Sequence, residues 1–125
     1  MRLAIVGAME NINEVDVKAI IYEFVHTVLN QGTKFLVVVS GGTKGVDTIA
    51  REAAADWGFP FILFKPQFML DPSRERNDKD FWIRDKQVVD NSDIVLIIGP
   101  KDCKRCIRVE KHAKRRGKKI ERRVL

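Results

Sequence analysis

A loop with three glycines follows one of the apolar runs of this chain and has the composition of an anion-binding site. The run Val37–Val39 ends at Ser40, and residues 41–45 then read Gly-Gly-Thr-Lys-Gly before an amphipathic stretch begins. The glycines leave backbone N–H groups uncovered, and the helix that follows adds the positive end of its dipole. One charge-assisted hydrogen bond from such an N–H group contributes about 1.5–3 kcal/mol. The loop therefore predicts a site for a phosphate, a carboxylate or a nucleotide.

Side chains in this loop and just after it suit the same ligand. Thr43 and Thr48 offer hydroxyl groups, and Lys44 offers a positive charge. Asp47 stands where a helix cap is wanted, so capping is its alternative role. A plain tight turn is the alternative for the glycines, because the pattern is neither a Walker P-loop nor Gly-x-Gly-x-x-Gly. The ligand contacts predicted here are Ser40, Gly41, Gly42, Thr43, Lys44, Gly45, Asp47 and Thr48.

Short apolar runs alternate with longer amphipathic segments along the chain, which predicts an α/β fold. We expect an open, mostly parallel, Rossmann-like sheet of about five strands with helices on both faces, in three layers and in a single domain, 1–125. Right-handed crossovers then bring every strand-to-helix loop to one edge of the sheet, where ligands of such sheets bind. The predicted strands are Leu3–Val6, Phe35–Val39, Phe61–Phe64, Asp93–Ile98 and Lys119–Leu125, and the predicted helices cover about residues 14–31, 46–57, 80–89 and 106–116.

Two further loops belong to that edge, and a third segment is long enough to have a function of its own. Gly7–Asn13 and Gly99–Arg105 follow the first and fourth predicted strands. Lys65–Lys79 is polar and charged, and a loop of this length is usually functional or mobile. Its carboxylates have no apolar surroundings in the sequence that would tune their pKa values, so a solvated lid is its alternative role.

Positive charge is concentrated at the C-terminal end of the chain. The net charge is +6, and residues 101–125 hold twelve Lys/Arg against three Asp/Glu. Such a region indicates an anionic partner such as nucleic acid. Solubility is the favoured alternative, because no aromatic residue interrupts this basic run to stack on bases. No apolar run approaches the roughly 20 residues of a membrane span, so we expect a cytoplasmic protein without a membrane partner.

Cys103 and Cys106 form a single Cys-x-x-Cys. A redox motif, half of a zinc site and a pair without chemistry are the three interpretations of such a pair. Few other ligands are available for zinc, since His112 lies six residues beyond Cys106. We therefore predict no metal site and favour a pair of surface thiols open to oxidation.

The residues from Val39 to Ala50, Val-Ser-Gly-Gly-Thr-Lys-Gly-Val-Asp-Thr-Ile-Ala, closely resemble the signature of the SLOG superfamily. This Rossmann-like group includes the DNA-processing protein DprA and the LOG-type nucleosidases, and the likeness is greatest to its small stand-alone members, the YspA/cpYpsA-related branch. Phe64–Phe68 resembles the family's strand that ends in Pro-x-x-aromatic, and Ile83–Val89 resembles its Ile-Arg-Asn stretch. The likeness covers nearly the whole chain.

The resemblance implies a domain that binds a nucleotide or another phosphorylated small molecule, without a separate cofactor. The phosphate would lie on Gly41 and Gly42. Arg84 would reach into the site, although an ion pair with Asp85 or Asp80 is an equal alternative for this side chain. A homodimer is expected because family members pair through helices. The residues implied to line the rest of the site are Gly7, Ala8, Met9, Gly99, Pro100 and Lys101.

The chain departs from the family at the loop after the fourth predicted strand. LOG-type nucleosidases have Pro-Gly-Gly-x-Gly-Thr-x-x-Glu there, whereas residues 99–106 read Gly-Pro-Lys-Asp-Cys-Lys-Arg-Cys. Two interpretations of this departure are open: Lys101, Lys104 or Arg105 replaces the lost glycine amides as a phosphate contact, or the site has lost hydrolytic function. Glu110 is near the place of the family's catalytic glutamate, and its alternative is a solvated residue paired with Lys114.

Three functions remain open on this basis. The first is nucleotide binding through the Ser-Gly-Gly loop, as a sensor or a small hydrolase. The second is a nucleoside monophosphate phosphoribohydrolase, which would cleave the N-glycosidic bond with Glu110 and Arg84 as catalytic residues. The third is a DprA-like accessory protein that binds nucleic acid through its basic C-terminal region. The sequence leaves open whether the protein is an enzyme.

Overall fold

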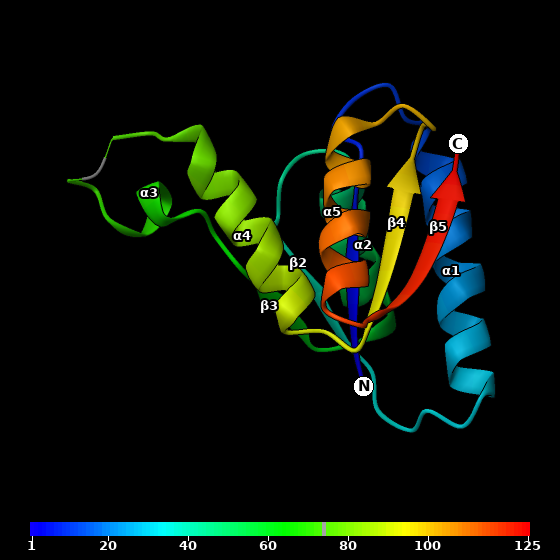
Figure 1. Ribbon diagram of the computed structural model, residues 1–125. Helices are drawn as coiled ribbons and strands as arrows, with labels where there is room; N and C mark the ends of the chain where they lie inside the picture. Colours follow the sequence, from blue (N-terminus) through cyan, green and yellow to red (C-terminus); the bar gives the residue numbers. More distant parts are fainter. Residues whose placement is uncertain (74) are drawn as a thin grey trace.

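Five parallel strands form one sheet in the computed structural model of the protein. The structure describes residues 1–73 and 75–125, so Arg74 of the predicted long loop lies outside the described residues. The strand order is β3-β2-β1-β4-β5, and every neighbouring pair is parallel (Figure 1). The predicted α/β, Rossmann-like class is confirmed. The strands are β1 (Arg2–Gly7), β2 (Val37–Ser40), β3 (Phe61–Leu63), β4 (Ile94–Gly99) and β5 (Lys119–Val124).

Helices cover both faces of the sheet. One face packs against α1 (Glu14–Asn30) and α2 (Val46–Trp57), and the other packs against α4 (Asp78–Asp90) and α5 (Lys104–Arg115). The alternation of side chains along the strands explains the two layers. In β1, Leu3 and Ile5 face the first helix pair, while Ala4 and Val6 face the second.

Local signals set the ends of these helices. Asn13 caps α1 by accepting a hydrogen bond from the backbone N–H of Asp16 at 3.1 Å. Asn77 caps α4 in the same way, so this helix begins at Asp78 rather than at the predicted residue 79 or 80. Gly58 ends α2 in the left-handed conformation, with a φ of 72°.

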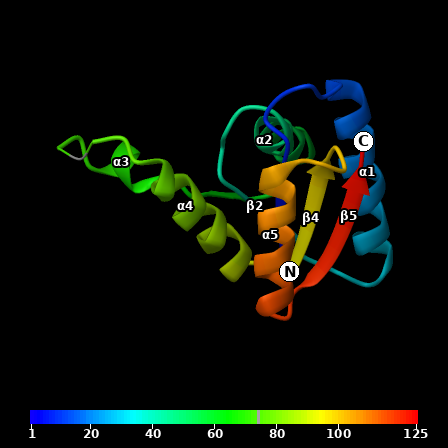
Figure 2. The same ribbon diagram turned by 45° about the horizontal axis from the view of Figure 1, so that its top comes forward.

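The chain reverses its direction of travel across the sheet between β1 and β4. From β1 it proceeds outward through β2 to β3, and it then returns to place β4 on the other side of β1. Ligands of doubly wound sheets bind at such a switch point, beyond the carboxyl ends of the strands. A Cβ atom at Gly7 would collide with the carbonyl oxygen of Ile98, so β1 and β4 are closely packed at this point. Figure 2 shows the β1–α1, β2–α2 and β4–α5 loops together at this end of the sheet.

A segment built on α3 (Gln67–Leu70) and α4 projects from the body of the protein (Figure 1). The sequence predicts a loop for residues 65–79, but four of them form α3. Phe68 of α3 packs against Phe81 of α4 with the ring centroids 5.3 Å apart, which holds the segment against the start of α4. Within the described ranges, 1–73 and 75–125, no helix has the length and apolar character needed to cross a membrane.

Candidate functional site

The glycine loop between β2 and α2 presents unused backbone N–H groups. Within the described part of the chain, the N–H groups of Gly41–Gly45 make no hydrogen bond. The β1–α1 loop fixes the end of the glycine loop, because the N–H of Val46 donates to the carbonyl of Ala8 at 3.1 Å. Gly42 and Gly45 have φ angles of 70° and 84°, which side-chain-bearing residues rarely adopt. The loop thus has the bare backbone that its sequence predicts.

The hydroxyl groups of this region bind the protein itself. Ser40 is fully buried, and its Oγ donates to the carbonyl of Ile5 at 2.9 Å, so its side chain belongs to the core. Thr43 donates from Oγ1 to the carboxylate of Asp47 at 2.8 Å. Thr48 donates from Oγ1 to the carbonyl of Thr43, also at 2.8 Å. The hydroxyl group of Ser40 is therefore used within the core, and the two threonines hold the loop in shape.

Asp47 has neither the predicted capping role nor an exposed carboxylate. Gly45 is the N-cap residue of α2, and the side chain of Asp47 is fully buried. Both of its oxygens accept hydrogen bonds from the guanidinium of Arg105, at 3.1 Å from Nη1 and 2.9 Å from Nη2. Bidentate pairs of this geometry are among the strong hydrogen bonds of proteins. Asp47 therefore joins the start of α2 to the start of α5.

Arg105 occupies the switch point between β1 and β4. Its Nη1 also donates to the carbonyl of Gly7 at 2.9 Å and to Oγ1 of Thr43 at 3.2 Å. Its Nε and Nη2 donate to the carboxylate of Asp85 on α4, at 3.0 and 2.9 Å. One guanidinium thus ties together the end of β1, the glycine loop, α2 and α4.

Arg84 meets the glycine loop from the other side. Its side chain is 2% exposed, and Nη1 donates to the carbonyl of Gly41 at 2.6 Å. Its Nε donates to Asp85 at 3.0 Å, so both alternatives predicted for this arginine occur together: it forms an ion pair and it reaches the loop. A Cβ atom at Gly41 would overlap the Arg84 side chain, so the glycine is needed for this approach.

The four buried charges of this network balance one another. Burial opposes the positive charge of Arg105, but the carboxylates of Asp47 and Asp85 outweigh it, and the pKa of Arg105 is raised above its ordinary value. Asp85 accepts from both arginines, and Asp47 accepts from Arg105. Because a buried charge without a partner is very costly, these residues depend on one another. The network can therefore support the loop without holding a net charge of its own.

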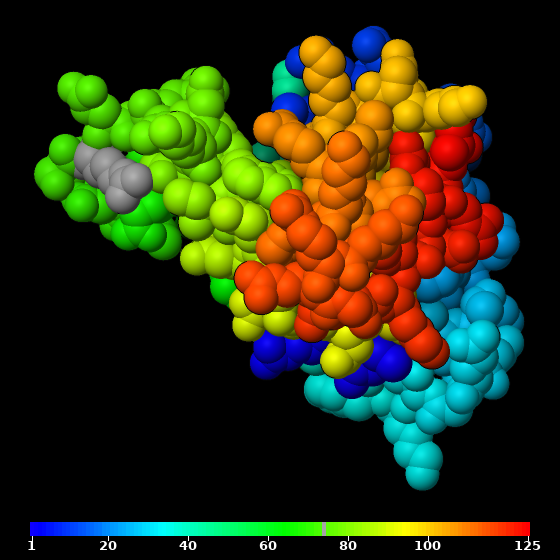
Figure 3. Space-filling view, in the orientation of Figure 1, coloured from blue at the N-terminus to red at the C-terminus, as the bar shows by residue number. Residues whose placement is uncertain are grey.

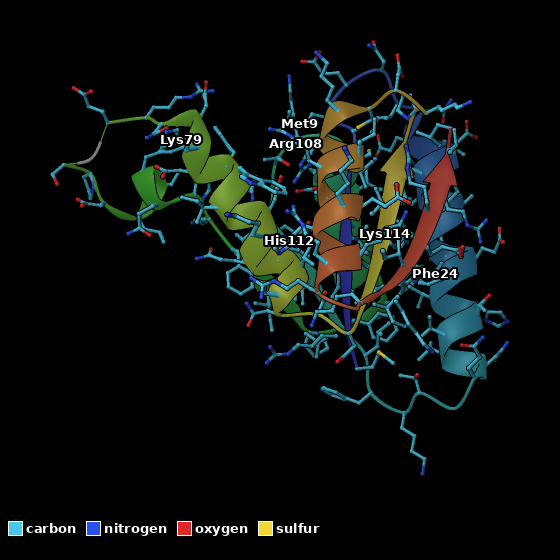
Figure 4. The ribbon with its side chains drawn as sticks, viewed as in Figure 1. Met9, Phe24, Lys79, Arg108, His112 and Lys114 are labelled. Atoms are coloured by element: carbon cyan, nitrogen blue, oxygen red, sulfur yellow. The ribbon has the colours of Figure 1, made fainter. Side chains whose placement is uncertain are left out.

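A cleft of about 690 Å³ lies between the glycine loop and the projecting α4. Figure 3 shows the corresponding notch between the green segment and the orange α5. In Figure 4, Met9 and Arg108 lie at the top of α5, on the side that faces α4. The cleft lining includes five cationic and three anionic side chains, together with two aromatic rings. The lining residues are Met9, Glu10, Gly42, Thr43, Lys44, Met69, Arg76, Asp78, Phe81, Trp82, Arg84, Asp85, Arg105 and Arg108.

The mouth of the cleft is bridged by one exposed ion pair. Nζ of Lys44 lies 2.6 Å from Oε1 of Glu10 and joins the β2–α2 loop to the β1–α1 loop. The hydrogen bond and the charge of Lys44 lower the pKa of Glu10. Exposed pairs of this kind contribute little to stability, so a competing anion can displace the Glu10 carboxylate at small cost.

Other residues predicted to line the site lie behind it. Ala8 is buried and contributes through its backbone. Gly99 and Pro100 turn their carbonyls toward the guanidinium of Arg122, at 2.9 and 2.6 Å, and Lys101 is exposed at the turn that follows. None of these four is among the residues that line the cleft. In this part of the chain, Arg105 in the first turn of α5 lines the cleft instead.

Glu110 is also outside the cleft. Arg105 and Arg108 are the α5 residues that line the cleft, and position 110 lies about 140° around the helix from position 105 at 3.6 residues per turn. The carboxylate of Glu110 is 3.9 Å from Lys114. Figure 4 shows Lys114 on the β5 side of α5, away from α4. The alternative of a paired helix residue therefore describes Glu110, and the structure does not bring it to the predicted catalytic position.

Trp82 contributes an aromatic ring to the basic surface of α5. Arg108 and Lys86 each lie over this ring at 5.7 Å, and His112 packs edge-on at 5.9 Å. A hollow of about 430 Å³ follows between α4 and α5, lined by Trp82, Lys86, His112, Arg115 and Arg116. The basic run of residues 101–125 contains no aromatic residue. The aromatic ring comes from α4 instead, and only the packing of α4 against α5 brings it to this surface.

Comparisons with known proteins give structural neighbours only. No family model and no curated protein matches the sequence. DNA processing protein A from Helicobacter pylori, described by its binding of single-stranded DNA, superposes with a TM-score of 0.72 at 19% identity. The match covers 98% of this chain but 64% of the neighbour, so the chain spans less than two thirds of that protein. The X-ray structure of TM1055 superposes with a TM-score of 0.67 at 21% identity, over 95% of this chain and 71% of the neighbour.

These neighbours identify the class of protein. The chain is an α/β protein with a Rossmann-like fold, which it shares with both of these structures. At such identities the likeness shows the fold alone, and membership of the SLOG superfamily is part of the proposed function.

Proposed function

We propose that this chain forms a SLOG-like domain of the YspA/cpYpsA-related branch that binds a nucleotide or a nucleotide-derived ligand. The ligand lies in the cleft between the glycine loop and α4. One observation carries the proposal: the N–H groups of Gly41–Gly45 make no hydrogen bond within the described residues and stand beside a cleft of about 690 Å³. Free amides at the start of a helix bind anions without further groups.

In this proposal the phosphate binds to the amides of Gly42, Thr43 and Lys44, all of which line the cleft. The Lys44 ammonium exchanges Glu10 for a phosphate oxygen. Arg84 and Arg105 remain with their carboxylate partners and position the loop from beneath, because breaking a buried pair costs about 3–5 kcal/mol. The binding energy then comes from the backbone and from the mouth of the cleft.

The other wall of the cleft suits a nucleoside. Phe81 and Trp82 present aromatic surface, and Met9 and Met69 present flexible apolar surface. Ligand sites commonly combine apolar walls with a few polar groups that fix orientation. A base that stacks on Phe81 and a phosphate on the loop would use both walls at once.

Binding is favoured over hydrolysis of the N-glycosidic bond. The glutamate expected to assist that reaction, Glu110, is not among the described residues that line the cleft, and it pairs with Lys114. Asp85, which does line the cleft, accepts hydrogen bonds from Arg84 and Arg105. Both oxygens of this carboxylate already accept hydrogen bonds from guanidinium groups, which gives Asp85 a role in holding the site together. We therefore favour a role as a ligand sensor, because binding needs no catalytic carboxylate, whereas cleavage of the N-glycosidic bond does.

Calorimetric titration with nucleoside monophosphates, and with inorganic phosphate, tests the proposal. Gly42→Asp places a negative charge on the loop, and we expect it to weaken binding about tenfold to a hundredfold, the value of one lost charge-assisted hydrogen bond. Equal binding by the wild-type protein and this variant would overturn the site.

Gly58→Asp is the matched control. Its φ of 72° is close to the 70° of Gly42, so both variants carry the same backbone strain and the same added charge. The two glycine variants differ in one respect, because a Cβ at Gly42 would also press on Leu63, whereas a Cβ at Gly58 meets open space. Lys44→Glu is therefore a second test, since this substitution adds no backbone strain. Its control is Lys34→Glu, an exposed lysine before β2.

A second candidate function is nucleic-acid binding, and the surroundings of Trp82 favour it. The ring is flanked by Lys86 and Arg108, and the hollow beside it adds Arg115 and Arg116. Aromatic stacking combined with cations along a groove is how proteins bind single strands without reading sequence. The neighbour from Helicobacter pylori is described by single-stranded DNA binding, which supports this candidate by analogy.

A further inference from the structure

Two cysteines stand at the first turn of α5, in positions that differ in access. Cys103 is the N-cap residue, and its Sγ accepts a hydrogen bond from the backbone N–H of Cys106 at 3.2 Å. Cys103 is partly exposed, whereas Cys106 is fully buried. The predicted pair of surface thiols is therefore wrong for Cys106, which lies in the core beside Val6 and Val109.

The two sulfurs face the same side of the helix. Residues three apart in a helix are neighbours on one face, with Cα atoms roughly 5 Å apart from the rise and radius of the helix. A disulfide needs Cα atoms about 4.4–6.8 Å apart, so the pair meets this requirement without a change of fold. The two thiols also interact with each other, since Cys103 is among the groups that raise the pKa of Cys106 through a hydrogen bond.

We propose that Cys103 and Cys106 form a reversible dithiol–disulfide site that reacts with small disulfides such as oxidised glutathione. Cys103 is the attacking thiol, because it is the accessible one of the two, whereas Cys106 is buried. Cys106 is the resolving thiol. A structural zinc site is disfavoured, because the described residues contain no cluster of three or more His, Cys, Asp or Glu side chains that would hold a metal ion.

The exchange proceeds in two balanced steps. The Cys103 thiolate attacks one sulfur of the small disulfide, forms a mixed disulfide and releases one thiolate, which takes up a proton from solvent. Cys106 then attacks Sγ of Cys103, the mixed disulfide bond breaks, and the proton of Cys106 passes to the departing small thiolate, which leaves as the second small thiol. Two protein thiols are oxidised and one small disulfide is reduced to two thiols.

The surroundings of Cys106 connect this site to the switch point. Its Sγ fills the space beside Gly99, where a Cβ atom would lie 2.7 Å from the sulfur. Closing the disulfide draws this sulfur away from Gly99 and toward Cys103. Arg105 lies between the two cysteines in sequence and donates to the carbonyl of Gly7. Oxidation therefore changes the environment of Gly99 directly and that of Gly7 through Arg105.

Mass spectrometry of the native protein after incubation with oxidised glutathione tests the proposal. We expect the wild-type protein to lose two thiols with no retained adduct. Cys106→Ala should retain one glutathione on Cys103, and Cys103→Ser should stay unmodified, since Cys106 is buried. Modification of Cys103→Ser at the wild-type rate would mean that unfolding exposes the cysteines, and this result would overturn the proposal. A glutathione adduct as the final product of the wild-type protein would overturn it as well.

A spectrum of ¹⁵N-glycine-labelled protein tests the connection to the strand ends without any nucleotide. On oxidation, the Gly99 and Gly7 resonances should move, while those of Gly32 and Gly58, which lie far from the pair, should not. Addition of a small dithiol should restore the starting spectrum. Unchanged Gly99 and Gly7 resonances in a protein that has lost two thiols would overturn the connection.

Discussion

The guanidinium of Arg105 and the carboxylate of Asp47 form a bidentate ion pair, with Nη2 to Oδ2 at 2.9 Å and Nη1 to Oδ1 at 3.1 Å. Arg105 is 9% exposed and Asp47 is fully buried. The pair closes the crevice between β1 and β4, where Arg105 also contacts Gly7 and Asp85. The glycine loop above it owes its position to this contact, because Thr43 binds both members of the pair.

Arg105→Met should destabilise the protein by about 3–5 kcal/mol, because it leaves two buried carboxylates without their shared partner. Urea unfolding measures the loss. Lys18→Met is the control, since it removes a pair of 3.9 Å at the surface and should cost less than about 1 kcal/mol. Similar losses in the two variants would contradict the role of Arg105. A double variant with Asp47→Asn should lose less than the two single variants together.

Much of this arrangement follows from the sequence, and the part that does not is set by packing. The five strands, the four long helices and the glycine loop have local signals, namely apolar runs, helical periodicity and Asn or Gly at helix ends. The ion pairs of Arg105 have no local signal in the sequence, because its partners Asp47 and Asp85 lie 58 and 20 positions away in the chain. α3 escapes detection because four residues are too few to show a period.

The two residues predicted with catalytic roles separate for a similar reason. Arg84 lies on the side of α4 that faces the glycine loop, as expected. The sequence predicts Glu110 near the loop after the fourth strand, but α5 begins at Lys104, and its phase puts position 110 about 140° around the helix from Arg105. Sequence distance alone does not fix the phase of a helix relative to a site.

The phosphoribohydrolase alternative is tested by incubating the protein with AMP and measuring free adenine. We expect no release above the rate without protein, because Asp85, the buried carboxylate among the described residues that line the cleft, already pairs with Arg84 and Arg105. Glu110→Gln is the informative variant. Release of adenine that this substitution abolishes would contradict a purely binding role.

Single-stranded DNA should quench the fluorescence of Trp82 if the second candidate function holds. Trp57→Phe leaves Trp82 as the sole tryptophan, because the chain has two. The logarithm of the affinity should fall with the logarithm of salt concentration by about 0.7 per phosphate contact. Arg115→Ala should reduce this slope by about 0.7, the value of one phosphate contact, and Lys34→Ala, outside the hollow, should leave the slope unchanged. A slope near zero would remove the nucleic-acid candidate.

Alkaline pH should destabilise the protein through Cys106. Burial, and then the hydrogen bond with Cys103, raise the pKa of this thiol from 9.0 to about 12, while the charges of Arg122 and Arg105 oppose the rise. Between these two values the native state binds more protons than the unfolded chain, so stability present below pH 9.0 is lost as the pH rises toward about 12.

Urea unfolding of the reduced wild-type protein and of Cys106→Ala at neutral and alkaline pH checks this dependence. The difference between the two proteins should shrink by up to about 1.4 kcal/mol per pH unit, the value for one proton. A difference that stays constant with pH would mean that the thiol titrates alike in both states.

The homodimer implied by the resemblance stays a separate prediction, which sedimentation velocity checks.

Nucleotide titration of ¹⁵N-glycine-labelled protein is the most direct measurement of the central claim. The chain has eight glycines, so each amide of the loop is observed beside its own internal controls. With a nucleoside monophosphate, the resonances of Gly41, Gly42 and Gly45 should shift and saturate, while those of Gly58 and Gly117 at helix ends should stay in place. If the loop glycines do not move at concentrations where calorimetry detects binding, the ligand lies elsewhere and the proposed site is contradicted.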